Sequence, residues 1–464
     1  MLPLGGCLLS TDKPDPGLDI PQAYDRGPKN PVLAEAALPP LDWWRAFRSK
    51  ELSEVIEEAR AANLDIAAAV AQIVQADAQS RIAGAPLLPG VTLNASATHA
   101  RSSQSTAGGS SGGSEFNNLS GSLTASYEID FWGKNRSALR AAEESAVASR
   151  YNREVVSLTT IVSVANTYFQ VLAAQDRLRI ARENVASATR ILNLIKQQFS
   201  AGTASDLNVA QQESLVNTQR AAIPPLVQTL RQSEAALALL IARPPERVVI
   251  RGGSMRGIAI PRITPGLPSE LLAQRPDIRQ AEAQLAAANA NVQNARAQFL
   301  PSITLTGEGG YQSAVLKTLL RPESAFYTLT AGLTQPIFEG GKLLGNLDLQ
   351  KGIQDQLLQN YRKAVISAFT DVDKALIAVR ETTIAERLQR DVVSSSRRAF
   401  NLSDQQLRAG TVNLITLLQV EQTLFQAEDA LAQARLARLQ AIVSLYQALG
   451  GGWLPKPLET SDAR

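Results

Sequence analysis

The residues that could carry out covalent chemistry in this chain are few. It contains one cysteine, Cys7, and one histidine, His99. A disulfide within the chain is excluded, and so is a zinc site built from Cys and His, because such a site needs three or four ligands. Cys7 and His99 would suffice for a nucleophile and its base, but His99 lies in an alternating Ser/Thr-rich stretch without a second catalytic motif.

Other residues that could do chemistry have ordinary structural explanations. Glu54, Glu57 and Glu58 fit one charged face of a helix, and Asp371 and Asp373 fall inside a long helical run. The segments TGEGGY and GGSSGG lack the strand–loop–helix context of a phosphate-binding loop. Two methionines are too few for a relay of soft metal ions. The sequence therefore predicts neither an enzyme nor a bound cofactor.

Cys7 has a better explanation as an attachment point. Leu4-Gly5-Gly6-Cys7 has the form of the end of a bacterial lipoprotein signal, in which small residues precede the cysteine that is lipidated. A working signal also needs a basic start and an apolar stretch of about 7–15 residues, which residues 1–6 cannot hold. Either the signal begins upstream of Met1 or the match is incidental, and the rest of the chain favours lipidation.

Charge and hydropathy limit the possible partners of the chain and the ways in which it could cross a membrane. The net charge is +3, and basic and acidic residues are interspersed along the chain. There is no long basic run and no stretch in which basic and aromatic residues alternate, so nucleic acid is disfavoured as a partner. We find no apolar run of about 18 residues, the length of a membrane helix. If the protein crosses a membrane, we expect it to do so with β-strands.

The sequence contains two copies of the same series of segments. QQFSAGTASDL begins at Gln197, QQLRAGTVNLI begins at Gln405, and upstream Leu88-Pro89 corresponds to Leu300-Pro301 at a similar spacing. The order of matching segments is preserved, which indicates an internal duplication. We divide the chain into a lipid-anchor and extended segment (1–50), repeat 1 (51–242), a linker (243–267), repeat 2 (268–449) and a C-terminal tail (450–464).

Each repeat opens with a helix and continues into strands. The spacing predicts helices over 52–83 and 269–299, each ending near a Leu-Pro pair. The pattern then alternates with period two, placing Val91, Leu93, Ala95 and Ala97 on one face of a strand. We expect a β-hairpin over 91–131 in repeat 1 and another over 301–338 in repeat 2.

A very long helical hairpin follows in each repeat. Residues 134–201 and 353–409 contain no Gly or Pro, and the first would form a helix on the order of 100 Å long. Apolar residues at alternating steps of three and four indicate a coiled-coil seam of Leu178, Ala181, Val185, Ala188, Leu192, Ile195 and Phe199. Gly202 and Gly410 would end these helices, which places hairpin tips at 200–205 and 408–413. Return helices are expected over 206–241 and 414–449.

Four strands a chain imply an assembly. A transmembrane barrel needs at least about eight strands, and open sheet edges are not tolerated in lipid. Two chains would pool about eight strands and three about twelve. More strands open a water-filled lumen, so a trimer would suit a conduit.

The sequence resembles the TolC-type outer-membrane factors, in the lipoprotein efflux-channel branch. The resemblance runs from Cys7 to Trp453 and rests on DWWRAF, SYEIDFWGKNR, RPDIRQAEAQL, ARAQFLPSITLTG, both AGT tips and LGGGW, in this order. It implies a mostly α, α+β fold: a trimeric TolC-like α/β-barrel with four transmembrane β-strands and long coiled-coil helices per chain. It also implies a homotrimer in the bacterial outer membrane, contacting lipid, with a helical tunnel in the periplasm.

The same resemblance implies partners and sites. Such channels dock through their helical tips on a periplasmic adaptor (membrane fusion) protein, which binds an inner-membrane transporter of the RND type. The residues at these positions are Ala201, Gly202 and Thr203, and Ala409, Gly410 and Thr411. A bare glycine would let the partner's backbone come close.

A constriction near the tips is a further expectation. Relatives carry acidic residues shortly after the second tip, where this chain has Thr416 and Gln419. Together with the nearby acids Asp206 and Glu421 they are our candidates for a periplasmic gate. Glu213 is a third acid in this region.

We expect an exit channel of a tripartite efflux pump, passively conducting small molecules such as drugs to the exterior. The alternative is the exit duct of a type I polypeptide secretion system, which has the same architecture. A coiled-coil or adaptor protein without a pore is the third interpretation, and the two pairs of strands argue against it.

Overall fold

The computed structural model describes residues 17, 39–101, 115–261, 274–451 and 453. Cys7, the loop 102–114 and most of the tail lie outside the described residues. The chain divides into two compact units, described separately below. Unit 1 takes residues 1–17, 72–150 and 280–362, and unit 2 takes 18–71, 151–279 and 363–464.

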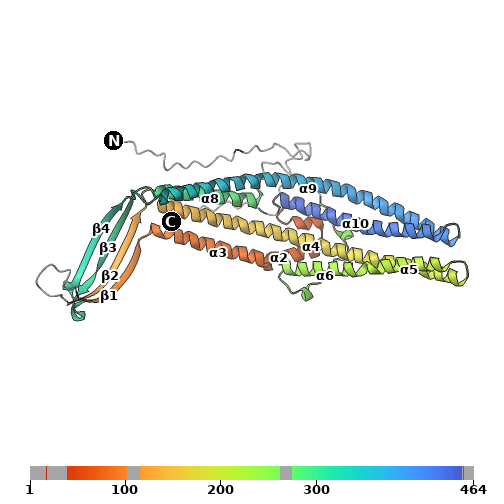
Figure 1. Ribbon diagram of the computed structural model, residues 1–464, viewed down its shortest axis with the longest axis horizontal. Coiled ribbons are helices and arrows are strands. Elements are labelled where there is room, and N and C mark those ends of the chain that lie inside the picture. Colours follow the sequence, from red (N-terminus) through yellow and green to blue (C-terminus); the bar gives the residue numbers. More distant parts are fainter. Residues whose placement is uncertain (1–16, 18–38, 102–114, 262–273, 452, 454–464) are drawn as a thin grey trace. The chain divides into compact units, whose positions relative to one another are not determined.

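Unit 1 is built around one antiparallel sheet in which the strands keep their order along the chain (Figure 1). The strands are β1 (Gly90–Arg101), β2 (Glu115–Ile129), β3 (Ser302–Ser313) and β4 (Ala325–Thr334). The pairing of β2 with β3, in which Leu123 lies opposite Gly309, joins the hairpin of repeat 1 to that of repeat 2. Both hairpins predicted from the alternation are therefore present.

Two sets of hydrogen bonds made by the SYEIDFWGKNR segment explain its side chains: one caps a helix and the other joins the two hairpins. Asp130 accepts hydrogen bonds from the backbone amides of Asn135 and Arg136, both at 2.9 Å, and so caps the start of α4. The Trp132 indole donates to the Pro301 carbonyl at 2.9 Å, which ties the end of one hairpin to the start of the other. A helix start needs such acceptors because its first amides have no partner within the helix.

The helices account for most of the chain. Two of them, α4 and α9, are single helices of 67 residues. The helices are α2 (Lys50–Ala62), α3 (Leu64–Gly84), α4 (Lys134–Ser200), α5 (Asp206–Ala221), α6 (Ile223–Leu240), α8 (Pro276–Ala297), α9 (Lys342–Arg408) and α10 (Leu414–Ala448), with short 3-10 turns at Trp43–Phe47, Ala85–Leu87, Pro245–Arg247, Met255–Gly257, Leu316–Thr318 and Pro322–Ser324. Helix α9 begins earlier than expected because it accommodates Gly345 and Gly352.

An aromatic core holds unit 2 together. Trp43 stacks on Tyr446 with ring centroids 4.7 Å apart, and Phe47 lies against Phe169 at 5.1 Å. Trp43, Trp44, Phe47 and Phe169 are all fully buried. The DWWRAF segment therefore packs against α4 and the end of α10.

The linker adds to this core. Met255 is buried in it, and the Ala259 amide donates to the Phe47 carbonyl at 2.9 Å. Arg435 of α10 donates to the Met255 and Ile258 carbonyls at 2.9 and 3.1 Å. The described part of the linker is thus packed on the helices by backbone as well as side-chain contacts.

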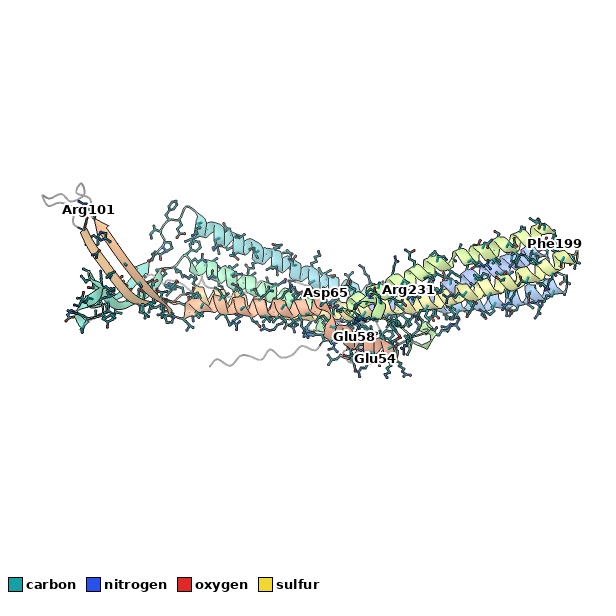
Figure 2. All side chains as sticks on the ribbon, turned by 90° about the horizontal axis from the view of Figure 1, so that it is seen from below. Glu54, Glu58, Asp65, Arg101, Phe199 and Arg231 are labelled. Carbon is teal, nitrogen blue, oxygen red and sulfur yellow. The ribbon has the colours of Figure 1, made fainter. Side chains whose placement is uncertain are left out.

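The predicted seam of α4 is largely confirmed. Leu178, Ala181, Ala188, Leu192 and Ile195 are buried, as their spacing predicts. The prediction is wrong for Phe199, which is exposed beside the hairpin tip (Figure 2).

One expectation about membrane helices needs correction. By length and composition, α4 contains one window apolar enough to cross a membrane, which the search for a purely apolar run overlooked. Half of this window is buried inside the protein. Val164, Ala165, Phe169 and Leu172 of α4 belong to the aromatic core, so this part of α4 is a core helix.

Two expected single helices are broken. Residues 206–241 form α5 and α6, separated at Ala222, because Pro224 and Pro225 lack amide hydrogens and fit only the first turn of a helix. Residues 52–83 are divided between α2 and α3 at Asn63, whose side chain caps α3 by accepting from the amides of Asp65 and Ile66 at 2.9 and 3.1 Å. Its amide group also donates to the Leu240 carbonyl at 2.8 Å.

Asn63→Ala is expected to destabilise the protein by about 1–3 kcal/mol, because it removes a cap and leaves the carbonyl of the half-buried Leu240 without its side-chain donor. Urea unfolding of the detergent-purified protein, followed by helical circular dichroism, measures the change. Asn193→Ala, at an exposed position on α4, is the control and is expected to have little effect. Equal stability of the two variants would contradict the assigned role of Asn63.

Candidate functional site

The tip between α4 and α5 is a compact helix-ending motif. Gly202 has φ of +75°, a left-handed conformation that side chains disfavour. The amide of Thr203 donates to the Gln198 carbonyl at 2.9 Å and the hydroxyl of Thr203 donates to the same oxygen at 3.0 Å. Ser205 then caps α5 by accepting from the Asn208 amide.

The tip between α9 and α10 repeats this geometry. Gly410 has φ of +73°, and Thr411 donates to the Gln406 carbonyl through its amide at 2.9 Å and its hydroxyl at 3.1 Å. Asn413 caps α10 by accepting from the Thr416 amide at 3.0 Å. The repeated phrase in the sequence therefore encodes one turn structure twice.

Both tips are open surfaces in the described protein. Ala201, Gly202 and Thr203 are exposed, and so are Ala409, Gly410 and Thr411. A β-carbon added to either glycine would meet no atom within 4 Å. Backbone conformation, and not crowding within the chain, is therefore what requires glycine here. The predicted docking role stays a prediction.

The four gate candidates do not share one environment. Asp206, Thr416 and Gln419 are exposed near the starts of α5 and α10, where they are free to line a passage. Glu421 is completely buried, so it does not extend that exposed group. The spacing of Leu414, Leu417, Glu421 and Leu424 is a seam pattern and would have predicted its burial.

The environment of Glu421 changes its acidity. Burial raises the pKa of Glu421 to about 7, and the negative charge of Asp404 adds to the rise, while Gln212, Arg190 and Ser187 oppose it by favouring the charged form. Among the described residues, neither carboxylate oxygen of Glu421 has a hydrogen-bond partner. Elsewhere in the described chain, no group of three or more His, Cys, Asp or Glu side chains could hold a metal ion.

The sheet of unit 1 has two chemically different faces. Paired positions share a face, so Leu93 and Leu123 lie on one side together, while Asn94 and Ser122 lie on the other. The apolar face carries Val91, Leu93, Leu123, Ala125, Ile303, Leu305, Tyr327, Leu329 and Leu333, and the polar face carries Thr92, Asn94, Ser96, Ser120, Ser122, Thr124, Thr304, Thr306, Glu308 and Thr328.

The apolar face is exposed. Leu93, Leu329 and Tyr327 are 76%, 80% and 82% accessible, and so much exposed large apolar surface on one face is unusual for a protein surface in water. The polar face is held by contacts between side chains, including Ser96 with Ser120 at 2.8 Å and Asn118 with Gln312 at 3.0 Å. The alternation along the sequence predicts the apolar positions of β1, whereas Glu308, a carboxylate on the polar face, was not predicted.

A sheet with an exposed apolar face and a polar one, in a chain with duplicated helical hairpins, defines the class of outer-membrane channel proteins. The chain belongs to the outer membrane efflux protein family, whose model matches residues 55–243 and 267–451.

Among its relatives is the pyoverdine export outer membrane protein OpmQ of Pseudomonas putida, 41% identical over 98% of this chain and 97% of the relative. The toluene efflux pump outer membrane protein TtgF of Pseudomonas putida is 34% identical over 97% of this chain and 95% of the relative. The solved Campylobacter jejuni CmeC outer membrane channel aligns with a TM-score of 0.89 at 26% identity, covering 96% of this chain and 95% of that one.

These findings confirm the TolC-like fold and the main functional prediction. The protein is an outer-membrane exit channel of an efflux system, and it is not a coiled-coil protein without a pore.

Gly410→Ala is expected to weaken the second tip by about 1–2 kcal/mol, because alanine disfavours the left-handed conformation. Gly410→Asn is the matched control, since asparagine tolerates that conformation better. Hydrogen exchange of residues 405–416 measures both effects. Faster exchange in the Asn variant than in the Ala variant would contradict the role given to φ.

Proposed function

We propose that three copies of this chain form a homotrimeric exit channel, anchored by lipid on Cys7, for small water-soluble molecules. The observation that carries the proposal is the two-faced sheet, with β1 and β4 at its open edges. Four strands cannot close on themselves, whereas about twelve can enclose a lumen. The apolar face would then contact lipid, and the polar face would line water.

The polar face would line the inside of the barrel with groups that hydrogen-bond to water and to polar cargo. It offers hydroxyl and amide groups and the carboxylate of Glu308 in its middle, while a second carboxylate, Glu128, lies on the same face opposite Thr304 and is paired with Lys134. The pyoverdine export of the OpmQ relative supports a secreted metabolite of this kind as the cargo. Channels of this type do no chemistry on their cargo, so we propose that the protein has no catalytic activity.

Glu308→Gln is expected to reduce the preference of the channel for cations, because a trimer would carry three Glu308 carboxylates around the lumen. Reversal potentials in planar bilayers under a salt gradient measure this preference. Glu54→Gln, at an exposed position on α2 (Figure 2), is the control and should leave the potential unchanged. An unchanged potential in the Glu308 variant would place this face away from the conducting path.

The partners we propose are a periplasmic adaptor at the helical tips and, through it, an inner-membrane transporter of the RND type. Two glycines that lack nearby atoms leave room for another backbone, which supports docking there. Gly202→Asn combined with Gly410→Asn keeps the turns and adds bulk. We expect export to fall several-fold while the amount of channel in the outer membrane is unchanged.

Cross-linking in intact cells followed by mass spectrometry of the purified channel tests the partners. Recovery of an adaptor and a proton-driven pump, lost in the double Asn variant, is the expected result. Recovery of an ATP-driven transporter with a secreted polypeptide would replace the proposal by the type I secretion duct. Undiminished export and recovery in the double variant would leave the tips with a capping role alone.

A further inference from the structure

A polar layer interrupts the apolar seam between the two helical hairpins. On α10, Glu421 lies between the buried Leu417 and Leu424, and on α5, Gln212 precedes the buried Val216. Gln212 and Glu421 are both completely buried and are neighbours. Each occupies a seam position that a coiled coil normally gives to an apolar side chain.

The carboxylate in this layer lacks a well-placed donor. The amide nitrogen of Gln212 donates to the Ala188 carbonyl of α4 at 3.0 Å, which fixes the orientation of the side chain. The oxygen of Gln212 and both oxygens of Glu421 have no partner in hydrogen-bonding geometry among the described residues, although the Gln212 amide group and the Ser187 hydroxyl lie close enough to Glu421 to favour its charged form. Three buried acceptors without a donor are costly, and a buried carboxylate is costlier still when it is charged.

The charged groups around the layer do not neutralise Glu421. Helix α4 contributes Arg190, α9 contributes Asp404, which is paired with Arg408 at 3.1 Å, and α5 contributes Glu213, which is paired with Lys196 at 2.7 Å. None of these cations forms an ion pair with Glu421 in the described structure.

Glu386 of α9 shows the usual arrangement for a buried carboxylate. It is almost fully buried and accepts hydrogen bonds from Arg390, Arg435 and Arg438 at 2.8 to 3.0 Å. Burial alone would raise its pKa, but Arg438 and Arg435 hold the pKa of Glu386 below its ordinary value. Glu421 has no such partners, and a proton is the one missing component that would supply both neutrality and a donor.

The chain also provides a hinge for this layer. Helix α5, which carries Gln212, is separated from α6 at Ala222, whereas α10 runs unbroken past Glu421. The apolar contacts that hold α5 near this level are few: Ala188, Leu192, Val216 and Phe425 form a small cluster of buried residues. A change in the layer can therefore move α5 without disrupting the large aromatic core.

We propose that Glu421 is a proton-binding site that controls how tightly α5 packs on α10 and α4. The protonated carboxyl donates a hydrogen bond within the layer and closes it. Loss of the proton leaves an anion beside the unpaired Gln212 oxygen, and α5 moves outward about Ala222 until water reaches the carboxylate.

The sign of the pH dependence follows from the two states. The packed state binds the proton with a pKa of about 7, and an opened, hydrated carboxyl would have the ordinary value of 4.5. Packing is therefore strongest below the ordinary value, weakens as the pH rises toward 7, and changes little above it. A polar layer that only fixed the register of the helices would show no such dependence.

Hydrogen exchange of the intact, lipid-reconstituted protein tests the proposal. Between pH 7.5 and pH 5, after correction for intrinsic exchange, protection of the α5 amides is expected to increase by on the order of 100-fold. The α10 amides near Leu439 in the aromatic core should show no matching change. A flat profile for α5 in the unaltered protein would overturn the proposal without any variant.

Two variants localise the effect. Glu421→Gln replaces the carboxyl by a neutral group of the same shape, so α5 should keep its acid-level protection at every pH. Glu213→Gln changes the acid at the corresponding position of repeat 1, which is half-exposed and already paired with Lys196, and should retain the full dependence of the unaltered protein. A Glu421→Gln variant with an undiminished pH dependence would refute the assignment. None of these readouts depends on export, so the outcome is separate from that of the proposed function.

Discussion

Burial of a continuous stripe is the constraint on which the helical part of this protein depends. A helix of 67 residues has its own backbone hydrogen bonds, but it stays in place only if one side is covered. In unit 2 the covering aromatic residues come from the start of the chain and from the end of α10, where Trp43 stacks on Tyr446. The linker closes the same core through Met255 and Ala259. Segments remote in sequence thus fasten the middle of the long helices.

The two repeats share the geometry of their helical tips but differ in their return helices and in the burial of their corresponding acids. Both tips use a left-handed glycine and a threonine that bonds one carbonyl twice. The return segments differ, because Pro224 and Pro225 divide one of them and nothing divides the other. The acids also differ: Glu213 is half-exposed and paired with Lys196, whereas Glu421 is buried and has no ion-pair partner among the described residues. Equivalent positions in the two repeats therefore have different environments, although the order of the elements is the same.

Much of the fold could be predicted because its signals are periodic or punctuated. Alternation of apolar and polar residues predicted the strands, and the spacing of apolar residues from Leu178 to Ile195 predicted the buried seam of α4. Predictions failed where a single side chain decides the structure: Asn63 ends one helix and begins another only because it also finds the Leu240 carbonyl. Burial of Glu421 was missed because charge was given more weight than position. The docking tips were predictable as turns, whereas their partners leave no trace in a single chain's geometry.

The exposed apolar face of the sheet has a consequence for biogenesis. In water, a newly delivered chain would present Leu93, Leu329 and Tyr327 together with two unpaired strand edges, the features of a template for aggregation. The helices of unit 2 have their own core and can fold without lipid. The strands gain a stable environment only on reaching the bilayer, so their apolar face and open edges must be kept apart from those of other chains until then.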